Sequence, residues 1–297
     1  MSMVQGIGQR LRQAIGAGPA GNPPQLFGMP PPSTQQGRGR VIAVAAQKGG
    51  VGKTTTAVQL AVALTQNHGL RVLLCDLDNQ GHVASSLRSH LRVSATQTVS
   101  SVLQAQDPDL LHAVLPTTVD GLSITGADKQ LGAAEAHLAA RIGREMLLMR
   151  ALRNARSQFD AIVLDCPPNL GLLTLNALLA ADHVLVPCDL SVLSLEGVDD
   201  LMNTLAQLEL TFGRTPHLLG LLHTRVDRRN QKQNATIRRA VAERYAGLPL
   251  SSEIAVNTAL SGAQLAGQSI FHASPESTGA RDYAALAAEV YGRVFQA

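Results

Sequence analysis

The stretch KGGVGKTT, residues 48–55, decides the fold because it joins an apolar run to a helical pattern. The run VIAVAA (41–46) is uninterrupted, as expected of a strand buried on both faces of a sheet. Apolar residues at helical spacing then continue to His68, and Gly69 follows as a helix stop. A strand, a glycine-rich loop and a helix in this order predict a phosphate-binding loop at the start of the helix.

The loop follows the pattern K-G-G-x-G-K-[ST] and departs from G-x-x-x-x-G-K-[ST], because Gln47 stands where the first glycine would be. Its glycines would let backbone N–H groups turn around a phosphate chain, which the positive end of the helix also attracts. Lys53 would place an ammonium on the β and γ phosphates, and the Thr54 hydroxyl would bind Mg²⁺. The predicted nucleotide-binding residues are Lys48, Gly49, Gly50, Val51, Gly52, Lys53, Thr54 and Thr55.

Acidic residues lie at the ends of two further apolar runs, RVLLCD (71–76) and AIVLD (161–165). Asp76 and Asp78 are placed at the end of the first predicted strand, and Asp165 ends the second. Ligands of doubly wound sheets bind at the carboxyl ends of the strands, so these acids are candidates for holding Mg²⁺ and orienting water. Asp76, Asp165 and Thr54 are the predicted metal ligands; a capping or turn role is the alternative for each acid.

Strand and helix patterns alternate along the rest of the chain. Further strands are expected at 122–125, 183–187 and 217–223, and helices at 130–156, 170–180, 195–212, 231–246 and 280–295. This alternation predicts an α/β fold, a doubly wound, mostly parallel sheet with helices on both faces, over residues 41–297.

Residues 1–40 differ in composition from the rest of the chain. They contain four arginines and no acid, and six of the 14 prolines fall between Pro19 and Pro32. This composition predicts a disordered or polyproline extension. Apolar residues recur at helical spacing within residues 1–18, which are therefore a candidate docking peptide for a partner, with a functionless tail as the alternative.

Composition argues against several classes of protein. Aromatic residues make up 3% of the chain and Trp is absent, which argues against stacking platforms for single-stranded bases. The three cysteines form no CxxC pair, which argues against a disulfide framework, a zinc site and an iron–sulfur carrier. No apolar run of transmembrane length and no secretory signal is found, so we expect a cytoplasmic protein without membrane attachment.

One 20-residue segment, 225–244, is strongly basic. It holds seven Lys and Arg residues against Asp227 and Glu243, for a local net charge of +5. Apolar residues at helical spacing leave the basic side chains to solvent, which predicts phosphate binding without sequence readout; a solvated charged face is the alternative. The predicted DNA-binding residues are Arg225, Arg228, Arg229, Lys232, Arg238 and Arg239.

The chain resembles the ParA family of P-loop ATPases, whose phosphate loop is of the deviant Walker type. The resemblance extends over residues 41–295. Its matching segments are QKGGVGKTT (47–55), DLDNQG (76–81), FDAIVLDCPPNLGLLTLNALLAADHVLVP (159–187) and LEGVDDL (195–201), with weaker similarity at 126–138 and 254–267.

The resemblance implies an Mg²⁺-dependent ATPase, slow without its partner, that forms a homodimer around ATP. Lys48 would reach the phosphates bound by the second subunit, Asp78 would position the hydrolytic water, and Asp165 would hold Mg²⁺ through water. Asn257 would lie near the adenine. The implied partners are nonspecific double-stranded DNA of the nucleoid and a ParB-like or other cargo adaptor.

The chain also departs from the family pattern. Asn79 stands where Pro is usual and His82 where Asn or Ser is usual, while Ala255 and Val256 replace Pro and Arg. Thr258, Ala259 and Gly262 differ as well, in a segment that contacts nucleotide and DNA in relatives. Two alternatives stay open: a nucleotide-dependent scaffold, if Asp78 is not competent, and a MinD-like membrane-positioning ATPase. The ending YGRVFQA argues against the latter, because it is not a basic amphipathic tail.

Overall fold

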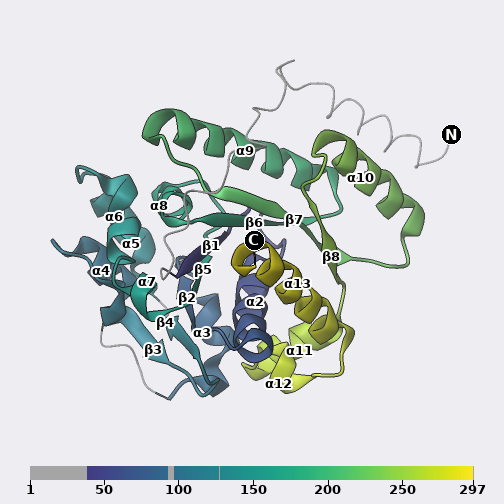
Figure 1. The fold of residues 1–297 in the computed structure, drawn as a ribbon, viewed down its shortest axis with the longest axis horizontal. Helices are drawn as coiled ribbons and strands as arrows, with labels where there is room; N and C mark the ends of the chain where they lie inside the picture. Colours follow the sequence, from purple (N-terminus) through teal and green to yellow (C-terminus); the bar gives the residue numbers. More distant parts are fainter. Residues whose placement is uncertain (1–38, 93–96, 127, 297) are drawn as a thin grey trace.

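A computed structural model describes residues 39–92, 97–126 and 128–296. Eight strands form one sheet in the order β3-β4-β2-β5-β1-β6-β7-β8 (Figure 1), and every neighbouring pair is parallel except β3 and β4. The predicted doubly wound, mostly parallel α/β fold is therefore confirmed. The strands are β1 Arg40–Val44, β2 Val72–Asp76, β3 Val114–Pro116, β4 Leu122–Thr125, β5 Ala161–Asp165, β6 His183–Asp189, β7 His217–Val226 and β8 Pro249–Ala255.

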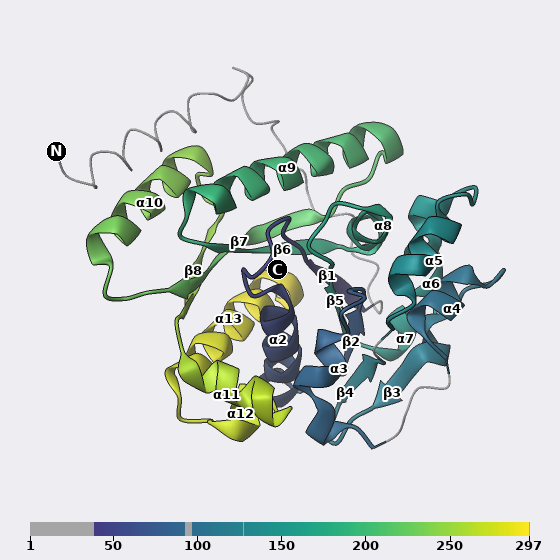
Figure 2. The same ribbon diagram turned by 180° about the vertical axis from the view of Figure 1, so that it is seen from behind.

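Helices cover both faces of the sheet (Figures 1 and 2). In β1, Ile42 and Val44 join the core that contains the buried faces of α2 (Lys53–His68) and α13 (Thr278–Phe295). The side chains of Val41 and Ala43 point the other way, because successive residues of a strand face opposite sides. They join the core beneath three further helices, α8 Leu172–Ala180, α9 Val192–Phe212 and α10 Gln231–Arg244.

Shorter elements complete the fold. They are α3 His82–Ser86, α4 Val99–Gln104, α5 Leu131–Leu138, α6 Leu147–Ala151, α7 Ala155–Gln158, α11 Thr258–Ala266, α12 Ile270–Ala273 and the 3₁₀ turns η1 Arg88–His90, η2 Leu110–Ala113 and η3 Arg144–Met146. Within the described ranges, no helix combines the length and the apolar character that crossing a bilayer requires. The predicted extension and docking peptide fall almost entirely within residues 1–38, outside the described residues.

Strand register brings the predicted acids to one edge of the sheet. Residue Asp165 at the end of β5 pairs with Val44 of β1 on one side and with Asp76 of β2 on the other. The carboxyl ends of three neighbouring strands therefore lie level with one another. The phosphate loop leaves β1 at this edge, so the loop and both acids share one place in the fold.

The structure differs from the sequence-based expectation at two kinds of element. The single helix expected over 130–156 is divided into α5, α6 and α7, and Gly143 between them has φ 69°, which an α-helix cannot contain. Strands β3 and β8 were not predicted. β8 is an edge strand whose side chains alternate between buried and partly exposed positions, so it lacks the continuous apolar run of a central strand.

Candidate nucleotide-binding site

The phosphate loop connects β1 to α2 through two residues in left-handed backbone conformations. Gly50 has φ 74° and Gly52 has φ 84°, values that glycine adopts without a Cβ clash. Gly52 is also the N-cap of α2, and Gly69 is its left-handed C-cap directly after His68, as predicted. The loop therefore delivers the chain to a helix N-terminus, where free N–H groups and the helix dipole favour an anion.

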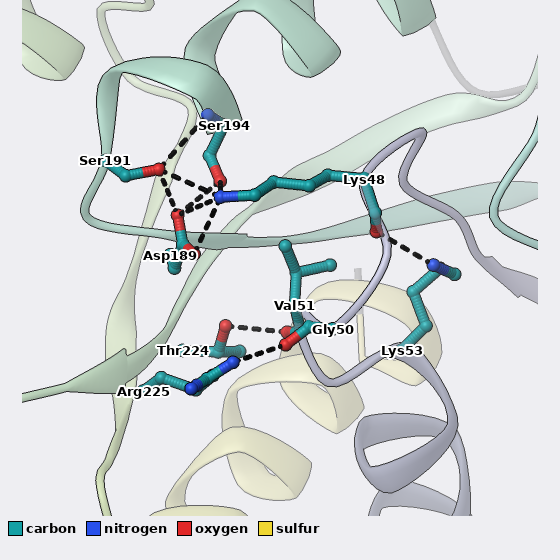
Figure 3. Close-up of polar contacts among 9 residues, drawn as sticks. All are labelled: Lys48, Gly50, Val51, Lys53, Asp189, Ser191, Ser194, Thr224 and Arg225. Carbon is teal, nitrogen blue, oxygen red and sulfur yellow. Dashed lines mark hydrogen bonds and ion pairs between the residues drawn. The ribbon is translucent and has the colours of Figure 1, made fainter.

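Lys53 lies at the first turn of α2 and is 7% exposed. Its Nζ donates a hydrogen bond to the carbonyl oxygen of Lys48 at 3.0 Å, inside the loop (Figure 3). Burial lowers the pKa of this ammonium, while Asp165 and Asp78 act in the opposite direction. The side chain is thus a cation held at the mouth of the loop, as the predicted role of binding phosphate requires.

Two residues at the end of β7 bind backbone carbonyl groups of the loop. The hydroxyl of Thr224 donates to the carbonyl oxygen of Val51 at 2.7 Å, and the Arg225 guanidinium donates to that of Gly50 at 3.0 Å (Figure 3). Both contacts join segments more than 170 residues apart in the sequence. Sequence patterns alone contained no signal for them.

The carboxylates of Asp165 and Asp76 lie side by side beneath the loop. Asp165 is fully buried, and neither of its carboxylate oxygens has a hydrogen-bond partner among the described residues. Burial raises the pKa of Asp165, and the neighbouring Asp76 raises it further. Burial likewise raises the pKa of Asp76 to about 7, although N–H groups of Asp78 and Val83 bind its oxygens.

Unpaired carboxylate oxygens in a buried site are costly, and a cation relieves that cost. Mg²⁺ prefers oxygen ligands, so the carboxylate of Asp165 fits this ion. Thr54 is near enough to influence the pKa of Asp165 and can supply a hydroxyl oxygen. Asp76 fits less directly, since both of its oxygens already accept backbone hydrogen bonds.

Asp78 lies two residues beyond the end of β2, which closes at Asp76, so the expectation that Asp78 itself ends the strand is wrong. Its backbone N–H donates to Asp76 Oδ1 at 3.0 Å, and its own Oδ1 accepts from the N–H of Gln80 at 3.0 Å. Across the described ranges no hydrogen bond engages Asp78 Oδ2. The turn therefore fixes the carboxylate and leaves one oxygen able to bind water.

Lys48 points away from the phosphate loop of its own chain. Its Nζ lies 3.0 Å from a carboxylate oxygen of Asp189, 3.1 Å from Ser191 Oγ and 3.4 Å from Ser194 Oγ (Figure 3). Asp189 ends β6, and Ser191 caps the N-terminus of α9. Sequence reasoning missed these three residues; their only signal was a polar DLS run after an apolar strand, at the edge where ligands bind.

Asn257 caps the N-terminus of α11. Its Oδ1 accepts from the N–H of Ala259 at 2.8 Å, and its Nδ2 donates to Thr278 Oγ1 at 2.6 Å. The side chain thus ties the start of α11 to the start of α13. A role near adenine stays a prediction. The neighbouring residue Val256 is 59% exposed, which is compatible with a ligand at this place.

The basic segment folds as the end of β7 and α10, with its predicted apolar stripe buried. Its charge is balanced more fully than the sequence suggested, because acids from other elements approach it. In addition to Asp227 and Glu243, carboxylates of β8, α9 and α13 take part. The ion pairs are Arg228–Asp282 (3.5 Å), Arg229–Asp227 (2.7 Å), Arg238–Glu253 (2.7 Å), Arg239–Glu243 (2.9 Å) and Arg244–Asp199 (2.7 Å).

The predicted DNA-binding residues differ in the exposure of their side chains. The side chains of Arg228, Arg229 and Arg239 are 68%, 87% and 83% exposed, so their ion pairs are solvent-screened and worth little. Arg238 is 38% exposed and binds both carboxylate oxygens of Glu253. Lys232 is exposed and has no ion pair within the described part of the chain.

A glycine loop at a helix N-terminus, a buried lysine and carboxylates at the adjoining strand ends define a P-loop nucleotide site. Comparison with known proteins agrees, since a family model described as AAA domain matches residues 39–216. Sporulation initiation inhibitor protein Soj of Bacillus subtilis is 38% identical over 85% of this chain and 98% of its own. Chromosome partitioning protein ParA of Myxococcus xanthus is 37% identical over 86% and 89%.

A solved structure extends the comparison to three dimensions. It is described as cobyrinic acid a,c-diamide synthase from Mycobacterium smegmatis with bound ATP analog and magnesium. It shares 36% identity and a TM-score of 0.72 with this chain, covering 87% of this chain and 97% of the other. The chain belongs to the ParA/Soj family of P-loop ATPases.

Replacing Asp165 with asparagine should stabilise the protein in the absence of nucleotide. Because the pKa of Asp165 is higher in the folded state than in the unfolded state, stability falls as pH rises from the unfolded-state pKa to the folded-state pKa, and the full cost is present above the folded-state pKa. Thermal unfolding in EDTA should therefore show the variant more stable at pH 8, by roughly 1–3 kcal/mol, with a smaller difference at pH 5. A variant less stable than the parent at pH 8 would contradict an unpaired charge at this position.

Proposed function

We propose that this protein is an ATPase that positions DNA or another large cargo. The observation that carries the proposal is the convergence, at one sheet edge, of a buried Lys53 on the phosphate loop and the unpartnered carboxylate of Asp165. Relatives named for chromosome partitioning support the class of function. We propose ATP as the substrate and Mg²⁺ as the cofactor, consistent with the ATP analog and magnesium of the related solved structure.

In this proposal the loop N–H groups and Lys53 bind the phosphates, and Thr54 and Asp165 hold the cation. Bound Mg²⁺ would neutralise charge on the phosphates during transfer to water. Asp78 accepts a hydrogen bond from the attacking water through Oδ2 and orients it. Hydrolysis yields ADP and phosphate.

Lys48 requires a conformational step before it can act on a second subunit. In the structure its ammonium is bound by Asp189 and two serine hydroxyls of the same chain, at 3.0–3.4 Å. We propose that ATP-dependent dimerisation moves this side chain from Asp189 to the phosphates bound by the partner subunit. The partly exposed ion pair, with side chains 31% and 23% exposed, costs little to break in comparison with a buried one.

The proposed dimer binds double-stranded DNA through the basic segment and releases it after hydrolysis. Arg228, Arg229, Arg239 and Lys232 are the cations of the segment whose own side chains are largely exposed and can reach phosphates. A dimer doubles this surface, and each neutralised phosphate releases counterions. A ParB-like or other cargo adaptor would stimulate hydrolysis, and we place the protein in the cytoplasm on the nucleoid.

Reversing the three charges Arg228, Arg229 and Lys232 to Glu should abolish DNA binding and spare basal ATP hydrolysis. Six lost phosphate contacts in a dimer remove most counterion release, so affinity for any duplex should fall by roughly 100-fold or more. Binding to two unrelated duplexes and phosphate release without DNA measure the two effects.

The matched control reverses the same number of exposed charges elsewhere, at Lys129, Arg150 and Arg153. This control should keep DNA binding within severalfold of the parent, because it changes net charge equally and leaves the basic segment intact. If both triple variants lose DNA binding to the same extent, only net charge matters and the basic segment is not the binding surface.

A further inference from the structure

Arg225 differs from the other arginines of the basic segment because it reaches the phosphate loop. Its Nη1 donates to the carbonyl oxygen of Gly50 at 3.0 Å, whereas the remaining arginines of the segment pair with carboxylates. The contact links the end of β7 to the loop at the end of β1, across β6 in the sheet order. Figure 3 shows Arg225 and Thr224 together beside Gly50 and Val51 of the loop.

The backbone of Arg225 is held in a conformation that arginine rarely adopts. Its φ of 53° makes it the sole residue other than glycine with positive φ in the described part of the chain. The β7–β8 register shifts between His223 and Val226, so the ladder is irregular around this residue. Such irregularities re-aim a side chain, and here the guanidinium is aimed at Gly50.

The orientation of the Gly50 carbonyl determines where the next N–H points. In a trans peptide the C=O and N–H bonds lie on opposite sides of the chain, and no cis bond occurs among the described residues. A Gly50 carbonyl held by Arg225 therefore turns the Val51 N–H away from β7. Thr224 acts in the same way on the Val51 carbonyl and hence on the Gly52 N–H. Successive N–H groups turned to one side form an anion-binding arrangement.

We propose that Arg225 is a positioning residue of the nucleotide site, which orients the Val51 N–H for the phosphates of ATP. This proposal rests on the ATP binding proposed above and assigns to Arg225 a role other than contact with DNA. The strained backbone is maintained because it delivers a charged donor to the loop. Loss of the guanidinium lets the Gly50–Val51 peptide rotate, so phosphate affinity falls even though Arg225 does not itself need to touch the nucleotide.

The test compares Arg225→Ala, Arg225→Gly and Arg225→Lys by titration with a fluorescent ATP analogue in Mg²⁺. Alanine and glycine should each weaken affinity by about tenfold, the loss of one charge-assisted hydrogen bond. Lysine should recover part of the affinity, because its ammonium can donate to the Gly50 carbonyl. Arg281→Ala, an exposed arginine of α13, is the matched control and should stay within twofold of the parent.

Thermal unfolding distinguishes the effect of backbone strain from the effect of losing the side chain. Glycine tolerates positive φ, so Arg225→Gly should be more stable than Arg225→Ala while having the same weak affinity. Unchanged affinity for the nucleotide in both variants would overturn the proposal. It would also be overturned if Arg225→Ala lost affinity while Arg225→Gly kept that of the parent. If neither Lys53→Ala nor Arg225→Ala changes affinity, the nucleotide site itself is misplaced, and the proposed function fails together with this inference.

Discussion

Replacing Lys53 with alanine is expected to abolish ATP binding at nucleotide concentrations that saturate the parent protein. The ammonium lies at the N-terminus of α2, is 7% exposed and already donates to the loop carbonyl of Lys48. Charge-assisted hydrogen bonds contribute about 1.5–3 kcal/mol each, so losing two to the β and γ phosphates should weaken binding by roughly 100-fold or more. Calorimetric titration with a non-hydrolysable ATP analogue and Mg²⁺ measures this loss.

Lys48→Ala is the natural control for this experiment. Its ammonium is bound by Asp189, Ser191 and Ser194, so its removal should leave the affinity of the monomer for ATP within a few fold of the parent. Dimerisation and hydrolysis should fall instead, as measured by light scattering and phosphate release. Equal losses of monomer affinity in Lys48→Ala and Lys53→Ala would contradict the separate roles of the two lysines.

Replacing Asp78 with alanine should slow ATP hydrolysis at least about tenfold, a barrier increase of ~1.4 kcal/mol, without abolishing nucleotide binding. Phosphoryl transfer to water requires a nucleophile held in line, and Asp78 Oδ2 accepts no hydrogen bond from the described residues, so it can accept one from water. Affinity should persist because Lys53, Thr54 and the loop N–H groups remain. The variant should therefore accumulate as an ATP-bound dimer that stays on DNA.

Single-turnover hydrolysis and dimer mass with ATP measure the two halves of this expectation. Asp165→Ala serves as the contrast, since it should weaken Mg²⁺-dependent binding as well as turnover. If Asp78→Ala hydrolyses ATP at the parental rate, the water is oriented by another group. Asp76 or a residue of 165–171 would then be the better candidate.

The central strands and the phosphate loop could be predicted because their signals are local. The runs at 41–46 and 161–165 are continuous and apolar, as strands buried on both faces must be, and Gly69 ends α2 where a left-handed cap is needed. The sequence predicted that Asp76 and Asp165 lie at the same edge, because parallel strands place their carboxyl ends there. The strand register of the structure pairs the two residues directly.

The missed features depend on contacts between distant segments. Asp189 lies 141 residues from Lys48, and Arg225 lies 175 residues from Gly50, so no spacing pattern could connect them. The acids Glu253 and Asp282 likewise approach the basic segment only in the fold. The local net charge of +5, counted from the sequence, therefore overestimated the positive potential of this surface. The half-exposed edge strand β8 lacked the apolar run that identified the central strands.

The most direct test of the central claim is the dependence of DNA binding on nucleotide and salt. Binding of the full chain to two unrelated labelled duplexes should be measured by anisotropy with Mg·ATP, with Mg·ADP and without nucleotide. We expect similar affinity for both duplexes with ATP, and a slope of log K against log salt of roughly −5 if each subunit neutralises ~3 phosphates. Binding should be lost with ADP. Equal binding in all three nucleotide states, or none at any salt concentration, would contradict an ATP-switched DNA-binding protein.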